Sequence, residues 1–279
     1  MPGKLYIVGT PIGNLGDMTY RAVETLGSVD FVAAEDTRVT QKLLNYFDIK
    51  KPLVSYHEHN RKAAGDEIIE RLEAGQTCAV VTDAGMPCIS DPGEDLVKLC
   101  AERGVPMEVV PGPSAVVSAL AVSGLDTSKF AFEGFLSTAP NSRKETLARV
   151  SHETRTIIFY EAPHKLSATL RDMYKFFGER RISICRELTK LHEEVIRTTL
   201  SEAVGLYDDN THKPRGEFVL VIEGLKEAPE AEMTLGDALI KVGELTEKGM
   251  RPTDACREIA KVTAFTKSEL YSALLAKKE

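Results

Sequence analysis

Five short apolar segments in the first half of the chain end in residues that could bind or transform a ligand. The endings are GTPIGN (9–14), EDTR (35–38), HEHN (57–60), DAG (83–85) and PGPS (111–114). They combine small residues, which let a backbone approach a ligand closely, with carboxylates and imidazoles that could move protons. Each ending also has an ordinary structural explanation, because Gly and Pro form turns and Asp side chains cap them. Five such endings in one half of the chain favour a ligand site.

The elements that carry these endings predict a parallel sheet. Short runs rich in Val, Ile, Phe and Tyr alternate with amphipathic stretches of helical length. Strands that alternate with helices form a mostly parallel sheet covered on both faces, and ligands sit outside the carboxyl ends of its strands. All five endings would therefore meet at one edge. The predicted strands are 4–11, 31–36, 52–57, 77–83 and 107–112, and the predicted helices are 19–27, 38–46, 63–74 and 93–103.

The second half of the chain has a different pattern. An apolar stretch at 114–125 predicts a buried helix, and we place the first domain boundary there. Three later strands have only one short helix among them, which indicates antiparallel hairpins. We predict an α/β fold with a parallel-sheet N-terminal lobe (1–113) and a mixed-sheet C-terminal lobe (114–226). The predicted strands are 130–136, 156–163, 182–188, 194–200 and 217–225, and the predicted helices are 143–150, 164–177 and 201–208.

The end of the chain predicts a small helical module. The polar stretch 226–232 contains a proline and is typical of a linker. Beyond it, Thr266 and Glu269 have the spacing of a capping box. Two short helices joined by a tight turn match a helix-turn-helix outline, so we predict a third domain over 233–279. Its predicted helices are 235–248, 253–262 and 267–277.

The composition disfavours several classes of protein. The 279 residues carry a net charge of −7, which counts against non-specific nucleic-acid binding but allows a local basic surface. No apolar run approaches the roughly 18 residues that span a bilayer, and no leader pattern opens the chain, so we expect a cytoplasmic protein without membrane contact. Five scattered cysteines predict neither a disulfide framework nor a metal site. The glycine motifs of dinucleotide and P-loop sites and the hydrolase nucleophile elbow are absent.

Taken together and in order, the motifs resemble those of the tetrapyrrole methylase superfamily. Within it they resemble the 16S ribosomal RNA (cytidine-2′-O)-methyltransferases of bacteria. The resemblance runs from about residue 4 to 225, although Met86 and Lys165 stand where the family is expected to have Thr and Arg. The motifs are LYIVGTPIGNL (5–15), AAEDTR (33–38), HEHN (57–60), TDAGMP (82–87), SDPG (90–93), PGPSA (111–115), FYE (159–161), RELTK (186–190) and GEFVLV (216–221).

This resemblance implies a homodimer whose subunits bind S-adenosylmethionine between two α/β lobes. The loop around Asp83 would then bind and align the cofactor instead of performing acid–base catalysis. The implied cofactor-binding residues are Pro11, Asp83, Ala84, Gly85, Ile89, Ser114, Ala115, Tyr160, Leu188, Gly216 and Glu217.

The implied reaction moves a methyl group to the ribose 2′-oxygen of a cytidine in 16S rRNA, either free or in the small ribosomal subunit. A hydroxyl is a weak nucleophile, so a base should take its proton. The candidate catalytic residues are His59, slightly ahead, His57 and Glu35. The helical tail could contribute to RNA binding or serve only in packing. The candidate RNA contacts are Arg38, Asn60, Arg61, Arg186 and Lys190.

Two other hypotheses remain open at this point. A corrinoid or porphyrinoid C-methyltransferase of the same superfamily would need a wide apolar cleft, whereas the endings at 35–38 and 57–60 make the rim polar; a tetrapyrrole absorbance shift would support it. A regulator that binds DNA through its terminal helices is disfavoured by the acidic charge, although Lys267, Lys277 and Lys278 lie in or beside the candidate recognition helix. A gel shift that survives moderate salt would support it.

Overall fold

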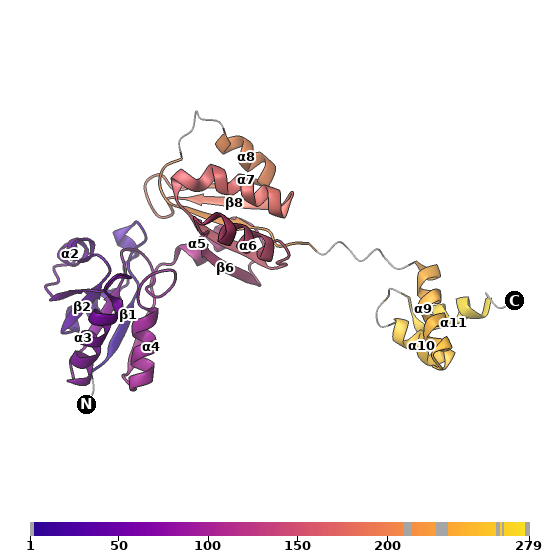
Figure 1. Cartoon of the computed structure of the whole chain (residues 1–279), viewed down its shortest axis with the longest axis horizontal. Coiled ribbons are helices and arrows are strands. Elements are labelled where there is room, and N and C mark those ends of the chain that lie inside the picture. The colour runs from indigo at the N-terminus through magenta and orange to yellow at the C-terminus, as the bar shows by residue number, and fades with distance from the viewer. Residues whose placement is uncertain (1–2, 209–213, 227–233, 261–262, 264, 277–279) are drawn as a thin grey trace. The chain divides into compact units, whose positions relative to one another are not determined.

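The computed structural model describes residues 3–208, 214–226, 234–260, 263 and 265–276. Contacts divide the chain into two compact units, Met1–Leu225 and Lys226–Glu279. The larger unit contains two five-stranded sheets and the smaller one is helical (Figure 1). This is the fold class that the sequence predicts. The boundary near residue 113, inside the larger unit, stays a prediction.

The first sheet is entirely parallel, with the strand order β3-β2-β4-β1-β5. Every residue of β2 and β4 is buried, which explains why these strands have no alternating polar positions. One core packs α3 and α4 against one face, and a second core packs α1 and α2 against the other. The strands are β1 (Leu5–Val8), β2 (Phe31–Ala34), β3 (Leu53–Ser55), β4 (Cys78–Val81) and β5 (Met107–Val110). The helices are η1 (Leu15–Asp17), α1 (Tyr20–Ser28), α2 (Thr37–Tyr46), α3 (Arg61–Glu73) and α4 (Glu94–Arg103).

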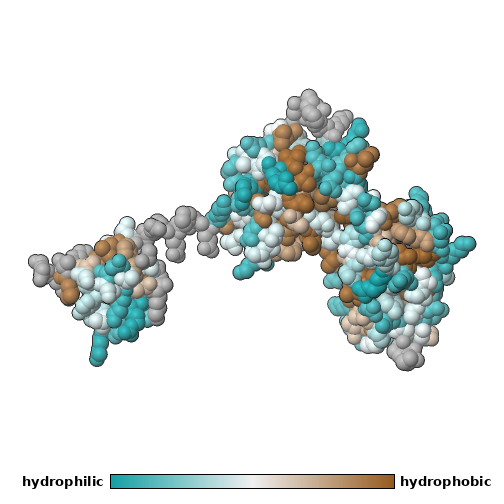
Figure 2. Space-filling model, turned by 180° about the vertical axis from the view of Figure 1, so that it is seen from behind, coloured by the Kyte–Doolittle hydropathy of each residue, from teal (hydrophilic) through white to brown (hydrophobic). Residues whose placement is uncertain are grey.

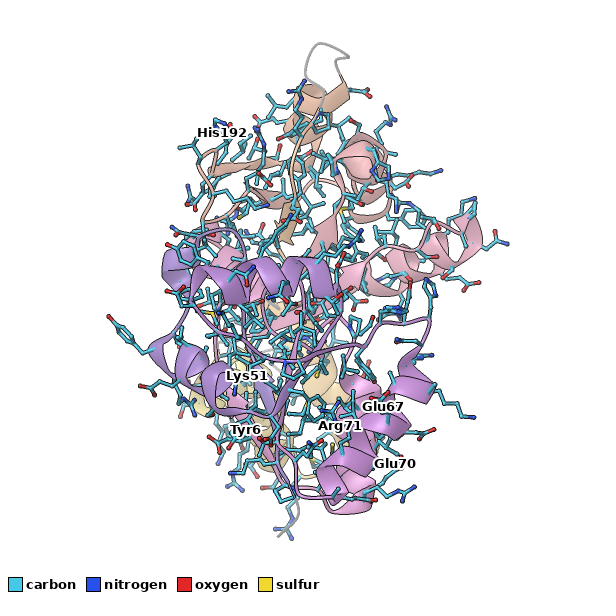
Figure 3. The ribbon with its side chains drawn as sticks, turned by 90° about the vertical axis from the view of Figure 1, so that its left-hand side faces the viewer. Tyr6, Lys51, Glu67, Glu70, Arg71 and His192 are labelled. Atoms are coloured by element: carbon cyan, nitrogen blue, oxygen red, sulfur yellow. The ribbon has the colours of Figure 1, made fainter. Side chains whose placement is uncertain are left out.

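Local side-chain capping starts two of these helices, α1 and α2. The Asp36 side chain accepts the backbone N–H of Arg38 at 2.8 Å, and Thr19 accepts that of Ala22 at 3.1 Å. Packing then fixes the helices on the sheet. Figure 3 labels Arg71 on α3. Its guanidinium lies 3.4 Å from the centroid of the Phe31 ring. The polar endings of the strands therefore gather at the carboxyl edge of the sheet, as predicted.

The second sheet is mixed, with the strand order β6-β7-β10-β8-β9. Only β6 and β7 are parallel, and the other neighbours are antiparallel, as the hairpin pattern predicts. Helix α6 starts at Pro140, three residues before the predicted start, because proline fits the first turn of a helix. The strands are β6 (Phe130–Phe135), β7 (Thr156–Glu161), β8 (Arg181–Arg186), β9 (Glu194–Thr199) and β10 (Phe218–Ile222). The helices are α6 (Pro140–Val150), η2 (Pro163–Lys165), α7 (Leu166–Phe177) and α8 (Leu200–Asp208).

Helix α5 (Ala115–Ser123) is buried on one side only. It packs on β8, β9 and β10, and Ala119 and Leu120 belong to the core beneath it. Val117 is 58% exposed and Val122 is 38% exposed. The prediction of a buried helix is therefore wrong for one face of α5 in the single chain, because an apolar sequence does not specify which faces its own chain covers.

The smaller unit consists of α9 (Leu235–Glu247), α10 (Pro252–Ala260) and α11 (Lys267–Ala276), which share a core around Val242, Cys256 and Leu270. The predicted capping box is present: Glu269 accepts the Thr266 N–H at 2.7 Å, and the Thr266 hydroxyl accepts the Glu269 N–H at 3.3 Å. The predicted linker 226–232, apart from Lys226, lies outside the described residues, as do the last residues of the predicted helices 253–262 and 267–277.

Three further observations concern the surface, the length of the helices and the cysteines. On the face in Figure 2, hydrophilic and apolar patches are interspersed on both units. Within the described ranges, no helix combines the length and the apolar character needed to cross a membrane. Cys78, Cys100, Cys185 and Cys256 are buried free thiols, as predicted, and Cys88 is partly buried.

Candidate functional site

Three strand ends of the first sheet are tied together by their backbones. Thr10 and Gly85 exchange two hydrogen bonds, of 2.9 and 3.1 Å, and the Thr10 hydroxyl donates to the Thr82 carbonyl at 3.1 Å. Gly9 and Gly112 pack so closely that a Cβ on Gly9 would lie 2.7 Å from the Cα of Gly112. The glycines of these endings therefore serve close backbone packing, which builds a rigid floor for a ligand site.

Above this floor lies a cavity of about 330 Å³, which we call the inter-lobe cavity because loops of both sheets line it. Gly85 lines this cavity, and its backbone has a φ of +85°, a conformation that favours glycine. Eight of the eleven predicted cofactor-binding residues line the cavity: Ala84, Gly85, Ile89, Ser114, Ala115, Tyr160, Leu188 and Glu217.

The other three predicted residues, Pro11, Asp83 and Gly216, do not line this cavity. Asp83 instead turns toward α2, where its carboxylate accepts the Asp36 N–H at 3.2 Å. No role is predicted for Ser90 and Asp91 from the sequence, although their motif is part of the resemblance. The alternation of strand residues does not predict the remaining lining residues either. The lining residues that were not among the predicted cofactor-binding residues are Ile12, Met86, Ser90, Asp91, Phe135, Glu161, Ala162, Pro163, Cys185, Phe218 and Val219.

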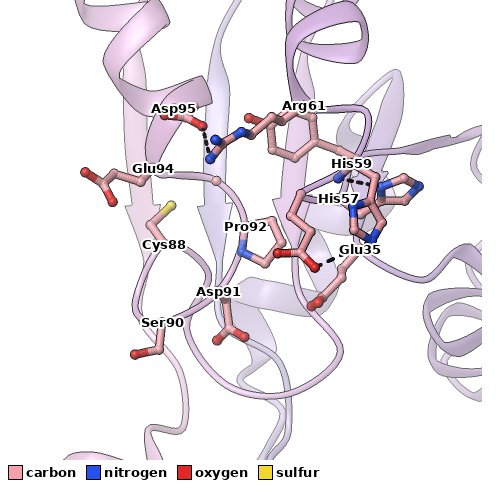
Figure 4. A pocket seen from close by; sticks show the side chains of 13 residues that line it. Glu35, His57, His59, Arg61, Cys88, Ser90, Asp91, Pro92, Glu94 and Asp95 are labelled. Carbon is pink, nitrogen blue, oxygen red and sulfur yellow. Dashed lines mark hydrogen bonds and ion pairs between the residues drawn. The ribbon is translucent and has the colours of Figure 1, made fainter. Parts of the chain in front are cut away.

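A second, more polar cavity of about 570 Å³ adjoins the first. We call it the carboxylate–histidine cavity (Figure 4). All three predicted catalytic residues line it, and so does Arg61. Its lining residues are Glu35, Tyr56, His57, Glu58, His59, Arg61, Cys88, Ser90, Asp91, Pro92, Gly93, Glu94 and Asp95.

The two histidines of this cavity differ in their surroundings. The His59 side chain is 82% exposed, with Nε2 3.6 Å from Glu58, while its backbone N–H donates to His57 Nδ1 at 3.3 Å. Asn60 accepts the His57 N–H and donates to the Ser55 carbonyl, both at 2.9 Å, so its amide holds the turn. Among the residues that the structure describes, no group of three or more His, Cys, Asp or Glu side chains is arranged to hold a metal ion.

Carboxylates dominate the electrostatics of this edge. Burial, followed by the charges of Glu35 and Asp83, raises the pKa of Asp91 to about 6. Burial likewise raises the pKa of Glu35 and of Asp83, and each is raised further by a neighbouring carboxylate. Asp36 behaves oppositely, because hydrogen bonds from Arg38 lower its pKa to about 2. At this edge, Asp36 is therefore the readily ionised carboxylate, whereas Glu35, Asp83 and Asp91 bind protons more tightly than usual.

The predicted basic contacts are all ion-paired. Arg38 pairs with Asp36 at 2.6 Å, and Arg61 pairs with Asp95 at 2.9 Å. Figure 4 shows the second pair on the opposite side of the cavity from the Glu35 and Asp91 carboxylates. Both arginine side chains remain more than half exposed.

The two basic residues in the second sheet have structural partners. Arg186 donates to the Arg215 carbonyl at 3.0 Å and to Glu194 at 3.1 Å. Lys190 donates to both Glu187 and Glu217 at 2.9 Å. These pairs hold the loop that carries Leu188 and place Glu217 at the inter-lobe cavity.

Residues 4–204 match the family of tetrapyrrole (corrin/porphyrin) methylases. The fold and the strand-end cavities are consistent with that match, and the chain belongs to this family. The membership implies S-adenosylmethionine as the methyl donor, the cofactor that the sequence predicts.

Similar proteins include two curated relatives. The chain is 48% identical to "Ribosomal RNA small subunit methyltransferase I" of Synechocystis sp. over 270 residues, which cover 96% of each chain. It is 50% identical to the protein of the same name from Thermotoga maritima over 222 residues, which cover 80% of this chain and 99% of that relative. The fold also resembles uroporphyrin-III-C-methyltransferase from Thermus thermophilus, with a TM-score of 0.56, 20% identity, and coverage of 78% of this chain and 94% of that one.

The residues of the inter-lobe cavity fit a nucleoside cofactor. Its volume of about 330 Å³ lies within the range of small-molecule sites. Apolar side chains such as Ile12 and Leu188 offer surface to an adenine ring, while Ser114 and Glu217 offer polar groups. A side chain at Gly85 would crowd the space, since a Cβ there would already stand 3.3 Å from Ile12.

Proposed function

We propose that this protein uses S-adenosylmethionine to methylate the ribose 2′-oxygen of a cytidine in 16S rRNA. The observation that carries the proposal is the meeting of two cavities, one suited to the donor and one polar, at the shared residues Ser90 and Asp91. The printed names of relatives at 48% and 50% identity support ribosomal RNA as the substrate.

The inter-lobe cavity is the proposed donor site. S-adenosylmethionine supplies a methyl group on a positively charged sulfur, which needs alignment with the acceptor more than activation. Ala84 and Gly85 provide a close backbone surface, and Tyr160 provides a partly buried ring. The carboxylates of Asp91 and Glu217 complement the positive charge of the donor. Pro11, Asp83 and Gly216 act by shaping the neighbouring loops.

The carboxylate–histidine cavity is the proposed nucleotide site. Its carboxylates suit the exocyclic amine of cytosine, because Asp and Glu accept hydrogen bonds from that group. They repel phosphates, so the RNA backbone is placed outside, where Arg38 and Arg61 offer exposed guanidinium groups. Arg186 and Lys190 would contact RNA only by exchanging their present partners. The same acidity disfavours a porphyrinoid substrate that carries carboxylate groups.

A homodimer is part of the proposal. Val117 and Val122 on α5 are exposed, although this helix is apolar on almost every side. A helix of that kind is normally covered, and a second copy of the chain would cover it. Sedimentation should give twice the mass of the chain, and Val117→Glu should shift the protein toward monomer. A native protein that sediments as a monomer at micromolar concentration contradicts the dimer.

The C-terminal unit is proposed as an accessory to the enzyme core. The Thermotoga relative is almost completely matched by 222 residues, so it is shorter than this chain by about the length of that unit. Removal of residues 226–279 should therefore preserve S-adenosylmethionine binding, as measured by calorimetry. If the unit binds RNA, the shortened protein should methylate small subunits more slowly than the full chain. If the unit serves only in packing, the two rates should be equal.

The decisive test of the function is mass spectrometry of rRNA nucleosides and fragments. The 2′-O-methylcytidine should disappear from 16S rRNA of cells that lack the gene and return when the purified protein and S-adenosylmethionine are added to their small subunits. Unmethylated free rRNA, tested in parallel, identifies the substrate form. Unchanged 16S rRNA in the mutant cells, or an absorbance shift with a tetrapyrrole, would refute the proposal.

A further inference from the structure

The inter-lobe cavity carries an exposed aromatic ring at its edge. Phe135 is the last residue of β6, and it lines this cavity although it is 59% exposed. An aromatic side chain in water is unfavourable, because its apolar surface gains free energy only when it is covered. Phe135 therefore combines contact with the donor cavity and a large apolar surface that a second molecule can cover.

A β-bulge turns this ring toward the cavity. Successive side chains alternate between the two faces of a strand, so spacing alone would place Phe132 and Phe135 on opposite faces of the second sheet. The pairing of β6 with β7 shifts by one residue between Phe132 and Gly134, and Gly134 has a φ of +66°. Both phenyl rings consequently contact Tyr160, with ring centroids 4.9 Å away for Phe132 and 5.4 Å away for Phe135. Bulges that re-aim a side chain in this way are frequent beside active sites.

The bulge also lies where the two cavities meet. A Cβ on Gly134 would stand 3.0 Å from Ser90 Oγ, and Ser90 lines both cavities. Phe135 follows directly after this contact in the chain. An RNA strand that places a cytidine in the carboxylate–histidine cavity and its ribose near the donor passes this boundary, so the neighbouring nucleotide comes within reach of the Phe135 ring.

The chemistry of the ring fits a nucleobase better than the other groups of an RNA strand. Single-stranded RNA is commonly bound by stacking of its bases on aromatic side chains, because every base has a flat π-face. A phenyl ring has neither a charge for phosphate nor a hydrogen-bonding group for ribose. Within the cavity, Leu188 is buried and Tyr160 is partly buried, which suits a ligand held inside, whereas Phe135 leaves most of its surface outside.

We propose that Phe135 is a substrate-binding residue on which the base next to the methylated cytidine stacks, an assignment that rests on the proposed function. The stacked base holds the RNA strand at the edge of the donor cavity. The ribose oxygen of the cytidine is thereby kept in position for alignment with the methyl group of the donor. The ring contributes to the affinity for RNA and not to the affinity for S-adenosylmethionine.

Phe135→Ala tests this assignment in steady-state methylation of small ribosomal subunits. The KM for the subunits should rise about 5-fold to 100-fold, the range expected for the loss of one stacked base, while kcat changes much less. The Kd for S-adenosylmethionine, measured by calorimetry, should stay within about threefold. Phe135→Tyr, which keeps a ring, should restore the native KM. Phe135→Leu, which keeps an apolar side chain without a ring, should not restore it.

The matched control is Phe130→Ala, which removes a 40% exposed ring at the other end of β6 and should keep the native KM. A native KM in Phe135→Ala overturns the assignment, and so does a recovery in Phe135→Leu that equals that in Phe135→Tyr, because it shows apolar packing alone. A loss of donor affinity that accounts for the whole decrease assigns the ring to the donor site instead. A shift of Phe135→Ala from dimer to monomer in sedimentation assigns it to a subunit contact instead.

The native enzyme separates failure of this assignment from failure of the proposed function. If the native enzyme methylates rRNA, the contrary results above refute the role of Phe135 alone. A native enzyme that does not methylate rRNA refutes the proposed function and the assignment with it.

Discussion

Asp91→Asn should make the protein more stable at neutral pH. The usual pKa of an Asp side chain is 3.8, and burial together with Glu35 and Asp83 raises that of Asp91 to about 6. The protonated form therefore stabilises the fold, and this stabilisation is fully present below pH 3.8 and is lost as the pH rises through about 6. Asn resembles the protonated acid, so the substitution restores the stabilisation at neutral pH.

The size of this effect follows from the pKa shift. Two pKa units correspond to about 3 kcal/mol in the free energy of unfolding. Because part of the Asp91 side chain remains in contact with water, solvent screening reduces this value, and we expect about 1–2 kcal/mol at pH 7.5. For a unit of this size, that gain raises Tm by about 3–6 °C. About half of the gain should remain at pH 5, and about a fifth at pH 4.

Urea unfolding and thermal melts of the protein without cofactor, at pH 7.5, 5 and 4, measure this dependence. Glu70→Gln should show no comparable gain, since that carboxylate is exposed to solvent. The reasoning would be refuted if Asp91→Asn were no more stable than the native protein at pH 7.5, or if its gain stayed constant down to pH 4. A gain in stability would show that the ionised carboxylate is kept at a cost to the fold, as is common at functional sites.

Two further variants test the donor site and the RNA surface. Gly85→Val should weaken S-adenosylmethionine binding at least tenfold, or about 1.4 kcal/mol, because its Cβ meets Ile12 at 3.3 Å. Gly104→Val is the control, since Gly104 also has a positive φ but its Cβ would meet nothing within 4 Å; equal affinities in calorimetry would contradict the donor site. Joint replacement of Arg38 and Arg61 by Ala should reduce the slope of log affinity against log salt by about 1–2 in titrations with single-stranded rRNA. Arg103→Ala, which removes another exposed and ion-paired arginine, should leave the slope unchanged, and an unchanged slope in the double variant would exclude phosphate contacts at the two sites.

The sequence by itself determined the fold class and the edge of the sheet where the candidate site lies. Continuous apolar runs at β2 and β4 required burial on both faces, and their alternation with amphipathic helices required a parallel sheet. The helix starts were also local, because Asp36 caps α2 and Thr266 with Glu269 forms a capping box. These features depend on near neighbours in the chain, which is why residue types and spacing were enough to predict them.

Only the tertiary structure decided which side chains share a cavity. Asn60 holds a turn, Asp83 turns toward Asp36, and Lys190 is neutralised by two glutamates, although all three looked like ligand contacts in the sequence. The position of Asp91 between two cavities comes from a loop in which Cys88 and Ser90 have positive φ values. Its pKa depends on burial and on Glu35, which lies far away in the chain. Side-chain direction and proton affinity are set by packing between segments distant in sequence, so the spacing of residues along the chain did not reveal them.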